Sequence, residues 1–360
     1  AMSNGIEFNK LYSLLDLCAI SIASDIVPIM GENRILACHG LRCLNTNPSV
    51  GIQAIIEVCG VGERELTIND IIFKIGPRIN ASGRMQNGRE AVELLVERDH
   101  ATAKELANRI NLYNEARKDL DKAMTEEAIE KVRDLPQLDE RRAVVIYNEE
   151  WHKGVIGIVA SRLTEIYYRP AVVLTRTNDL ATGSARSVSG GFDVYKAVEY
   201  CRDLLENFGG HTYAAGLSMK AENVEKFTER FEEYVAAHIL PEQTSAVIDI
   251  DAEIDFRDIT TKFHLDLKRF NPFGPDNHKP IFCTHNVYDY GTSKVVGREQ
   301  EHIKLELVDN KSNNVMNGIA FGQSSQARYI KTKRSFDICY TIEENTHKRG
   351  EVQLQIEDIK

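Results

Sequence analysis

A histidine lies among glycines and alanines in the stretch FGGHTYAAG, residues 208–216. A backbone with so few side chains lets a ligand approach its amide groups, and exposed amides bind anions such as phosphate. The stretch predicts that Gly209, Gly210 and His211 contact a phosphate, with the His211 ring donating a hydrogen bond. Packing alone is the alternative, because a glycine also ends a helix and its neighbour can simply be hydrogen-bonded. Composition favours the two interpretations equally.

The stretch GSARS, residues 183–187, places a hydroxyl and a guanidinium two residues apart. Residues two apart on a strand share a face, so Ser184 and Arg186 are expected to point to the same side. A guanidinium fork matches the geometry of a phosphate, although a lone arginine on a strand is usually just a solvated charge. Beside the Gly-Gly-His stretch in the same small sheet, the pair predicts a phosphate clamp.

Residues 76–85, GPRINASGRM, carry two arginines and no acidic residue. Their glycines and proline predict a loop that presents Arg78, Asn80 and Arg84. This composition suits contact with a nucleic-acid backbone, although a basic loop is more often only solvated.

His152 lies in the stretch WHKGVIGIVASR, just before a predicted helix. Free amides and the dipole at a helix start favour an anion. We rank His152 below His211, because the apolar face of that helix is explained by core packing alone.

Asp25 is the only carboxylate between Ala23 and Ile26 in an otherwise apolar stretch. By itself it suits a helix cap or a buried hydrogen-bonding acid. A metal site needs several oxygen or nitrogen ligands, and no His-Glu or Asp-x-Asp pattern completes one.

Basic and aromatic residues gather near the C-terminus, as they do on a surface that stacks and neutralises a single strand. The basic residues are Arg328, Lys331, Lys333 and Arg334, and the rings belong to Phe321, Tyr329 and Phe336. An exposed basic hairpin with core aromatics is an equally good interpretation.

Composition limits the classes of protein to which the chain can belong. Its 360 residues suit two or three domains, and its 42% hydrophobic and 27% charged residues are typical of a globular protein. Neither a membrane span nor a signal peptide is visible. The seven cysteines form no Cys-x-x-Cys pair, which predicts reduced thiols in the cytoplasm. A net charge of -10 argues against non-specific coating of nucleic acid.

The periodicity of apolar residues predicts an α/β plus all-β architecture. Residues 90–132 contain neither Gly nor Pro and repeat apolar residues at helical spacing, which predicts a long connector helix in one or two pieces. Strands and helices alternate over residues 142–239, with one helix running to about Asn207. From residue 246 polar and apolar residues alternate, which predicts a small β-barrel of oligonucleotide-binding (OB) type.

In this order the stretches resemble the RecJ family of single-strand-specific exonucleases, within the DHH phosphoesterase superfamily. ASDIVPIMGENRI resembles the last metal-binding motif of the DHH domain, and GPRINASGRM its arginine-containing loop. WHKGVIGIVASRL, GSARS and FGGHTYAAG resemble the DHH-associated domain, and NPFGPDNHKPIF resembles the start of the OB domain. The resemblance covers nearly the whole chain.

The resemblance implies an N-terminally truncated chain with four parts. These are residues 1–85 as the remnant of the DHH domain, 86–137 as connector helices, 138–243 as the substrate-binding DHH-associated domain, and 244–360 as the OB-type barrel.

The family implies a 5'-to-3' exonuclease that hydrolyses single-stranded DNA in repair and recombination, using two Mn²⁺ or Mg²⁺ ions. By this resemblance Asp25 is a metal ligand. Arg78, Ser184, Arg186 and the Gly-Gly-His stretch would hold the 5' phosphate and the nearby backbone. A single-strand-binding protein and a helicase are the implied partners, and no membrane is involved.

One departure from the family is that its earlier aspartate motifs and its Asp-His-His triplet do not occur in this sequence. We therefore expect the chain to be inactive as a nuclease by itself. Two alternatives remain open. A DHH-family phosphatase or nanoRNase shares the Gly-Gly-His stretch but normally lacks the β-rich last part, and a non-catalytic DNA-end-binding scaffold would have lost its metals.

Overall fold

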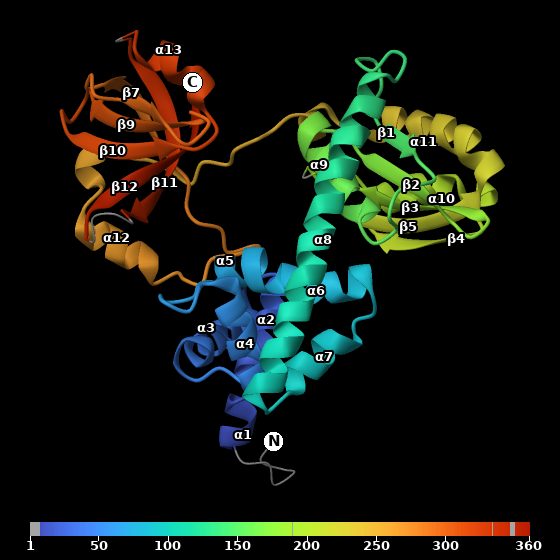
Figure 1. Ribbon diagram of the computed structural model, residues 1–360. Helices are drawn as coiled ribbons and strands as arrows, with labels where there is room; N and C mark the ends of the chain where they lie inside the picture. The colour runs from blue at the N-terminus through green and yellow to red at the C-terminus, as the bar shows by residue number, and fades with distance from the viewer. Residues whose placement is uncertain (1–7, 189, 333, 346–349) are drawn as a thin grey trace. The chain divides into compact units, whose positions relative to one another are not determined.

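The computed structural model describes residues 8–188, 190–332, 334–345 and 350–360. The chain divides into two compact units, one of residues 47–247 and one of residues 1–46 with 248–360. Figure 1 shows the elements that make up each unit. None of the helices in the described ranges is both long and apolar enough to cross a lipid bilayer.

Helices form the first half of the 47–247 unit. They are α4 (Val50–Cys59), α5 (Ile68–Asp70), a π-helical turn (Ile71–Ile75), α6 (Gly76–Met85), α7 (Arg89–Val96) and α8 (His100–Arg133). Helix α8 has 34 residues and is therefore roughly 50 Å long. Asp99 caps it by accepting a hydrogen bond from the Thr102 amide at 2.9 Å. The long helix predicted over residues 90–132 is thus present as two helices, α7 and α8.

Helix α8 joins this helical part to a five-stranded sheet. It packs on α4, α6 and α7, and its residues Met124, Ala128 and Val132 pack on α9 (Ile156–Tyr167) and β1 (Val144–Tyr147). In Figure 1, α8 runs from beside α7 to beside α9. A single rigid element therefore fixes the position of α6 relative to the sheet.

The sheet has the strand order β1-β2-β3-β5-β4. Its other strands are β2 (Ala171–Thr177), β3 (Leu180–Arg186), β4 (Asn207–His211) and β5 (Ala214–Lys220). Strands β1 and β2 are parallel and the remaining pairs are antiparallel. Because side chains alternate along a strand, the sheet presents two faces with different coverings.

The two faces of the sheet are covered unequally. Helices α10 (Val194–Tyr200) and α11 (Val224–His238) close one face over a core that includes Ala185, Ala215 and Leu217. On the opposite face α9 packs over β1 and β2 and reaches β3. On β5 and β4 this face is formed by Ala214, Gly216 and Gly209 and is open to solvent at the two glycines.

The other unit contains three N-terminal helices and a β-barrel. The helices are α1 (Phe8–Tyr12), α2 (Leu15–Ser24) and α3 (Gly31–Thr46). The strands are β6 (Ala252–Glu253), β7 (Phe282–Asp289), β8 (Lys294–Val296), β9 (His302–Asp309), β10 (Val315–Ala320), β11 (Phe336–Glu344) and β12 (Val352–Ile359), with α12 (Thr261–Lys268) and α13 (Ala327–Ile330) outside them. The order is β6-β7-β11-β12-β10-β9-β8, and an additional β7–β9 pairing closes the barrel. The predicted OB-type barrel is confirmed.

Two sequence-based boundaries are wrong. The helix expected to run to about Asn207 ends at Tyr200, because Asn207 begins β4 and pairs with Ser218 of β5. Residues 246–251 alternate apolar and polar side chains but form no strand. The apolar side chain of Val247 is not buried in the structure, since 66% of the residue is exposed. Alternation predicts a strand only where a neighbouring strand supplies hydrogen bonds, and here the pairing begins at Ala252.

Candidate phosphate-binding site

Strand β3 brings Ser184 and Arg186 together on the face that α9 reaches. Burial alternates residue by residue along β3, with Ala185 buried on the opposite face. The Arg186 Nη1 donates hydrogen bonds to the Ser184 Oγ at 2.7 Å and to the Ala185 carbonyl oxygen at 2.8 Å. Both acceptors are neutral, so these bonds orient the guanidinium without cancelling its charge.

The first turn of α9 lies directly against this pair. A Cβ placed on Gly157 would come within 2.8 Å of the Arg186 Nη2 and within 3.1 Å of the Ser184 Oγ. Both distances are too short for an ordinary contact, so the absence of a side chain at Gly157 leaves room for the guanidinium. Helix and strand together therefore fix where Arg186 points.

Gly157→Ala is expected to displace Arg186 without unfolding the protein. The added methyl meets only the flexible ends of Arg186 and Ser184, and alanine is the better helix former by about 1 kcal/mol. We expect an unchanged or slightly raised Tm together with several-fold weaker phosphate binding. Thermal unfolding and titration of a 5'-phosphorylated oligonucleotide check this, and an unchanged affinity would contradict the assigned position of Arg186.

Arg186 carries an uncompensated charge. Its side chain is partly buried, and the hydrogen bonds that its guanidinium makes to the described residues go to neutral acceptors. Burial lowers the pKa of the Arg186 guanidinium, and the positive charge of Arg84 lowers this pKa further. An arginine nevertheless stays protonated in a protein. A desolvated cation of this kind is stabilised by an anion, and a guanidinium binds phosphate bidentately.

The β4–β5 hairpin continues the same face beside Arg186. Ser184 pairs with Gly216, which pairs with Gly209, so these three residues form one row across three strands. Arg186, Ala214 and His211 form the neighbouring row. At about 4.8 Å between strands, the backbones of Arg186 and His211 lie roughly 10 Å apart, with only a methyl group between them.

The three glycines of the hairpin have different roles. A Cβ on Gly209 or on Gly216 would meet nothing within 4 Å, so both leave open backbone. A Cβ on Gly210 would lie 2.2 Å from the Ala214 carbonyl oxygen and 2.5 Å from the Ala215 Cα. Gly210 is therefore needed for hairpin packing, whereas Gly209 and Gly216 leave space that a ligand can fill.

His211 is exposed at the end of β4. Its Nδ1 accepts a hydrogen bond from the Tyr213 amide at 3.3 Å, and its ring meets the Tyr213 ring edge-on at 6.3 Å between centroids. A neutral ring that accepts at Nδ1 carries its proton on Nε2. His211 can therefore donate from Nε2 to an anion above the glycine row.

Arg78, Asn80 and Arg84 lie on helix α6, so the prediction of a loop is wrong. Proline fits the first turn of a helix, where its missing N–H costs nothing, and Pro77 takes that position. The helix is stabilised by packing against α8, which buries Ala81.

Helix α6 directs its arginines to different places. The Arg84 Nη1 donates to the Gly154 carbonyl oxygen at 3.1 Å, and the Gly154 amide donates to the His152 Nδ1 at 3.1 Å. Arg84 and His152 therefore both contact Gly154, just before α9. Arg78 instead donates to the Asn111 Oδ1 at 2.8 Å, roughly 9 Å further back along α6.

Three charged residues next to this site were missed by the sequence analysis. Arg117 and Asp121 lie one turn apart on α8, and Arg162 lies on α9. The Asp121 carboxylate, with 3% of the residue exposed, accepts two hydrogen bonds from Arg162 at 2.9 and 2.8 Å. In the sequence these residues are indistinguishable from the many solvated charges of α8.

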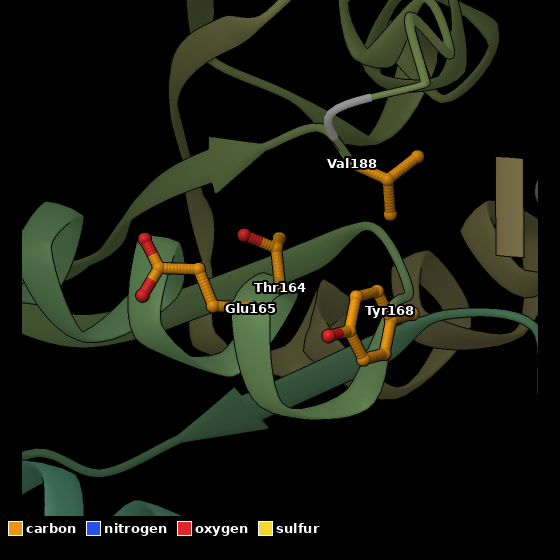
Figure 2. Close-up of a pocket in the computed structure, with 4 residues that line it drawn as sticks. All are labelled: Thr164, Glu165, Tyr168 and Val188. Carbon is orange, nitrogen blue, oxygen red and sulfur yellow. The ribbon is translucent and has the colours of Figure 1, made fainter. Parts of the chain in front are cut away.

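A separate pocket of about 140 Å³ lies toward the end of α9 and is lined by Thr164, Glu165, Tyr168 and Val188. Figure 2 shows the Glu165 carboxylate extending away from Tyr168 and Val188. Thr164 is seven residues beyond Gly157, roughly 10 Å along the helix. None of the described residues that line this pocket is a cation, so we assign it no role in phosphate binding.

Comparison with known proteins identifies the five-stranded sheet domain and the β-barrel. The family model described as the DHHA1 domain matches residues 140–237, and the model described as the RecJ OB domain matches residues 250–358. The single-stranded-DNA-specific exonuclease RecJ of Bacillus subtilis is 36% identical over 301 residues, which cover 83% of this chain. The chain belongs to the RecJ family.

Solved RecJ structures have the same fold as this chain. A crystal structure of RecJ from Thermus thermophilus in complex with Mg²⁺ is 26% identical, with a TM-score of 0.82 over 97% of this chain. The corresponding Mn²⁺ complex is 27% identical, with a TM-score of 0.80 over 97% of this chain. The chain spans 38% of the length of the Bacillus subtilis relative and about half of the Thermus thermophilus chain, 52% and 50% in the two complexes.

The RecJ relatives imply metal ions, but the described residues of this chain do not fit a complete metal centre. Asp25 is exposed just after α2, and the described part of the chain contains no group of three His, Cys, Asp or Glu side chains arranged to hold an ion. One carboxylate cannot hold Mg²⁺ or Mn²⁺, which take several oxygen ligands. We therefore derive no catalytic step through a metal in this chain.

The residues expected to contact DNA on the RecJ OB domain lie mainly around α13. Arg328 and Lys331 are exposed on and after this short helix, not on a hairpin, and Lys333 lies outside the described residues. Phe321 is 53% exposed and meets the His302 ring edge-on at 5.0 Å, but Phe336 is 3% exposed. Phe336 is a core residue, so it cannot stack on a base.

Proposed function

We propose that this chain carries the end-recognition part of a 5'-to-3' exonuclease for single-stranded DNA. The observation that supports the proposal is the partly buried Arg186, which has only neutral hydrogen-bond partners and lies beside the open row of Ser184, Gly216 and Gly209. This arrangement suits the terminal 5' phosphate, which offers more charge than an internal phosphodiester.

Each site residue has a role in this proposal. Arg186 and Ser184 hold the 5' phosphate, and His211 donates to it or to the next phosphate. Arg84 and His152 form the opposite wall of the site, with Arg78 and Asn80 further along α6 on the path of the strand. Backbone amides at the hairpin approach the strand closely because Gly209 and Gly216 carry no side chain.

The OB barrel supplies a second contact with the strand. Exposed rings and cations hold single strands without sequence preference, and Arg328, Lys331 and Phe321 are exposed on this barrel. A platform of this kind suits a long strand better than a dinucleotide. We therefore favour the exonuclease over a phosphatase or nanoRNase acting on very short nucleotides.

Hydrolysis by this family is proposed to use Mn²⁺ or Mg²⁺, with Asp25 as the one ligand that this chain offers. Because the described residues do not complete the centre, the chain by itself is expected to bind DNA ends without cleaving them. Release of mononucleotides that survives repurification and stops on addition of EDTA would contradict this expectation.

The proposal is tested by the affinity of the chain for a fluorescent oligothymidylate with a 5' phosphate and for the same strand with a 5' hydroxyl. At one fixed salt concentration we expect the phosphorylated strand to bind about tenfold more tightly, since charged hydrogen bonds contribute that much. Equal affinities for the two strands would contradict the proposed recognition of the 5' end. A preference for dinucleotides over the long strand would instead support the phosphatase or nanoRNase interpretation.

A further inference from the structure

The strongest feature that the proposed function leaves unexplained is a chain of guanidinium groups extending from the sheet to helix α8. The positive charge of Arg84 acts on the arginines at both ends of this series, because it lowers the pKa of Arg186 and also the pKa of Arg117. Contacts place these groups around helix α9. The Arg84 Nη1 donates to the Gly154 carbonyl oxygen just before α9, and Asp121 links Arg117 to Arg162 on α9.

Arg117 is fixed in place and shares its carboxylate partner, Asp121, with Arg162. Its side chain is 12% exposed, and its Nη2 donates to the Oδ1 of the buried Asn114 at 2.7 Å. Its Nη1 lies 3.7 Å from the Asp121 Oδ2. Both Asp121 oxygens, however, already accept short hydrogen bonds from Arg162.

The charges in this group do not balance. Arg84, Arg117, Arg162 and Arg186 supply four positive charges, and the carboxylate that contacts them in the described structure is Asp121. Burial lowers the pKa of the Arg117 guanidinium, and the charges of Arg84 and Arg162 lower it further while Asp121 raises it. Cations held this close together repel one another and are stabilised when anions enter.

We propose that Arg117 is a further binding residue for a second phosphate of the nucleic-acid strand, one that is next to the phosphate held by Arg186. This inference rests on the proposed function and extends it by assigning the connector helix a contact with the substrate. The ligand must carry at least two phosphates, because Arg186 on β3 and Arg117 on α8 are separate binding residues. A polyanionic strand meets that condition, whereas a mononucleotide reaches only one site.

The test compares Arg117→Gln with Lys122→Ala, a matched control that removes one positive charge from the exposed side of the same helix. We expect Arg117→Gln to weaken binding of a 5'-phosphorylated oligothymidylate about tenfold and to reduce the slope of log affinity against log salt by about 0.7. Affinity for thymidine 5'-monophosphate, measured by competition, should stay unchanged, and Lys122→Ala should resemble the wild type.

The variant Arg117→Lys distinguishes the loss of a phosphate contact from a structural effect of the substitution. This variant keeps the charge, so it should keep the wild-type salt slope while losing part of the affinity with the guanidinium fork. A reduced slope in Arg117→Lys, or equal binding by Arg117→Gln and Lys122→Ala, would overturn the inference. If those results occur while Arg186→Ala still weakens binding, the inference alone fails. If the wild-type chain binds no oligothymidylate, both the inference and the proposed function fail.

Discussion

Replacing Arg186 with alanine is expected to weaken binding of a 5'-phosphorylated single strand by about tenfold to hundredfold. The guanidinium is partly buried and its hydrogen bonds within the chain go to the Ser184 hydroxyl and the Ala185 carbonyl. Because no carboxylate of the described residues neutralises it, its removal costs no internal ion pair. The fold should therefore persist, and the affinity for the 5'-hydroxyl strand should change much less. Titration of both strands at one salt concentration measures the difference.

Two variants serve as controls for this result. Arg176→Ala removes an arginine from β2 of the same sheet, where the side chain is 56% exposed and pairs with Glu149 at 2.7 Å. It should bind as the wild type does, because an exposed pair contributes little. Arg186→Lys keeps the charge but loses the guanidinium fork, so its affinity should fall between that of the wild type and that of Arg186→Ala. Equal loss in Arg176→Ala and Arg186→Ala would show that net charge, not a defined site, determines the affinity.

Gly210→Ala is expected to destabilise the protein by about 1–3 kcal/mol, because the new methyl group meets backbone atoms that cannot rotate away. Its Cβ would lie 2.2 Å from the Ala214 carbonyl oxygen and 2.5 Å from the Ala215 Cα. The hairpin must then shift, which separates His211 from Ala214 and disturbs the edge of the sheet. For a unit of this size we expect the Tm to fall by several degrees, as measured by thermal unfolding.

Gly216→Ala is the matched comparison within the same hairpin. Its Cβ meets nothing within 4 Å, so the Tm should stay close to that of the wild type. The methyl would nevertheless occupy the row between Ser184 and Gly209, and we expect weaker binding of the phosphorylated strand. A large loss of stability in Gly216→Ala, or a normal Tm in Gly210→Ala, would mean that the structural and binding roles of the two glycines are reversed.

The position of the arginines on α6 shows how local sequence can mislead. The glycines and proline of GPRINASGRM favour a loop when the segment is considered alone. In the fold the segment packs along α8, and a proline at the first turn does not interrupt a helix. Burial of one face against a long neighbouring helix outweighs the weak propensities of individual residues.

The sequence by itself determined which residues share a face and which stretches match a family. The two-residue repeat of a strand is a local property, so Ser184 and Arg186 could be placed together without a structure. Only the tertiary structure decided that Gly157 makes room for Arg186, that Gly209 and Gly216 continue the row of Ser184 beside it, and that Arg117 on α8 and Arg162 on α9 share Asp121. These contacts depend on strand register and helix packing between distant segments, and neither is encoded in the spacing of residues along one segment.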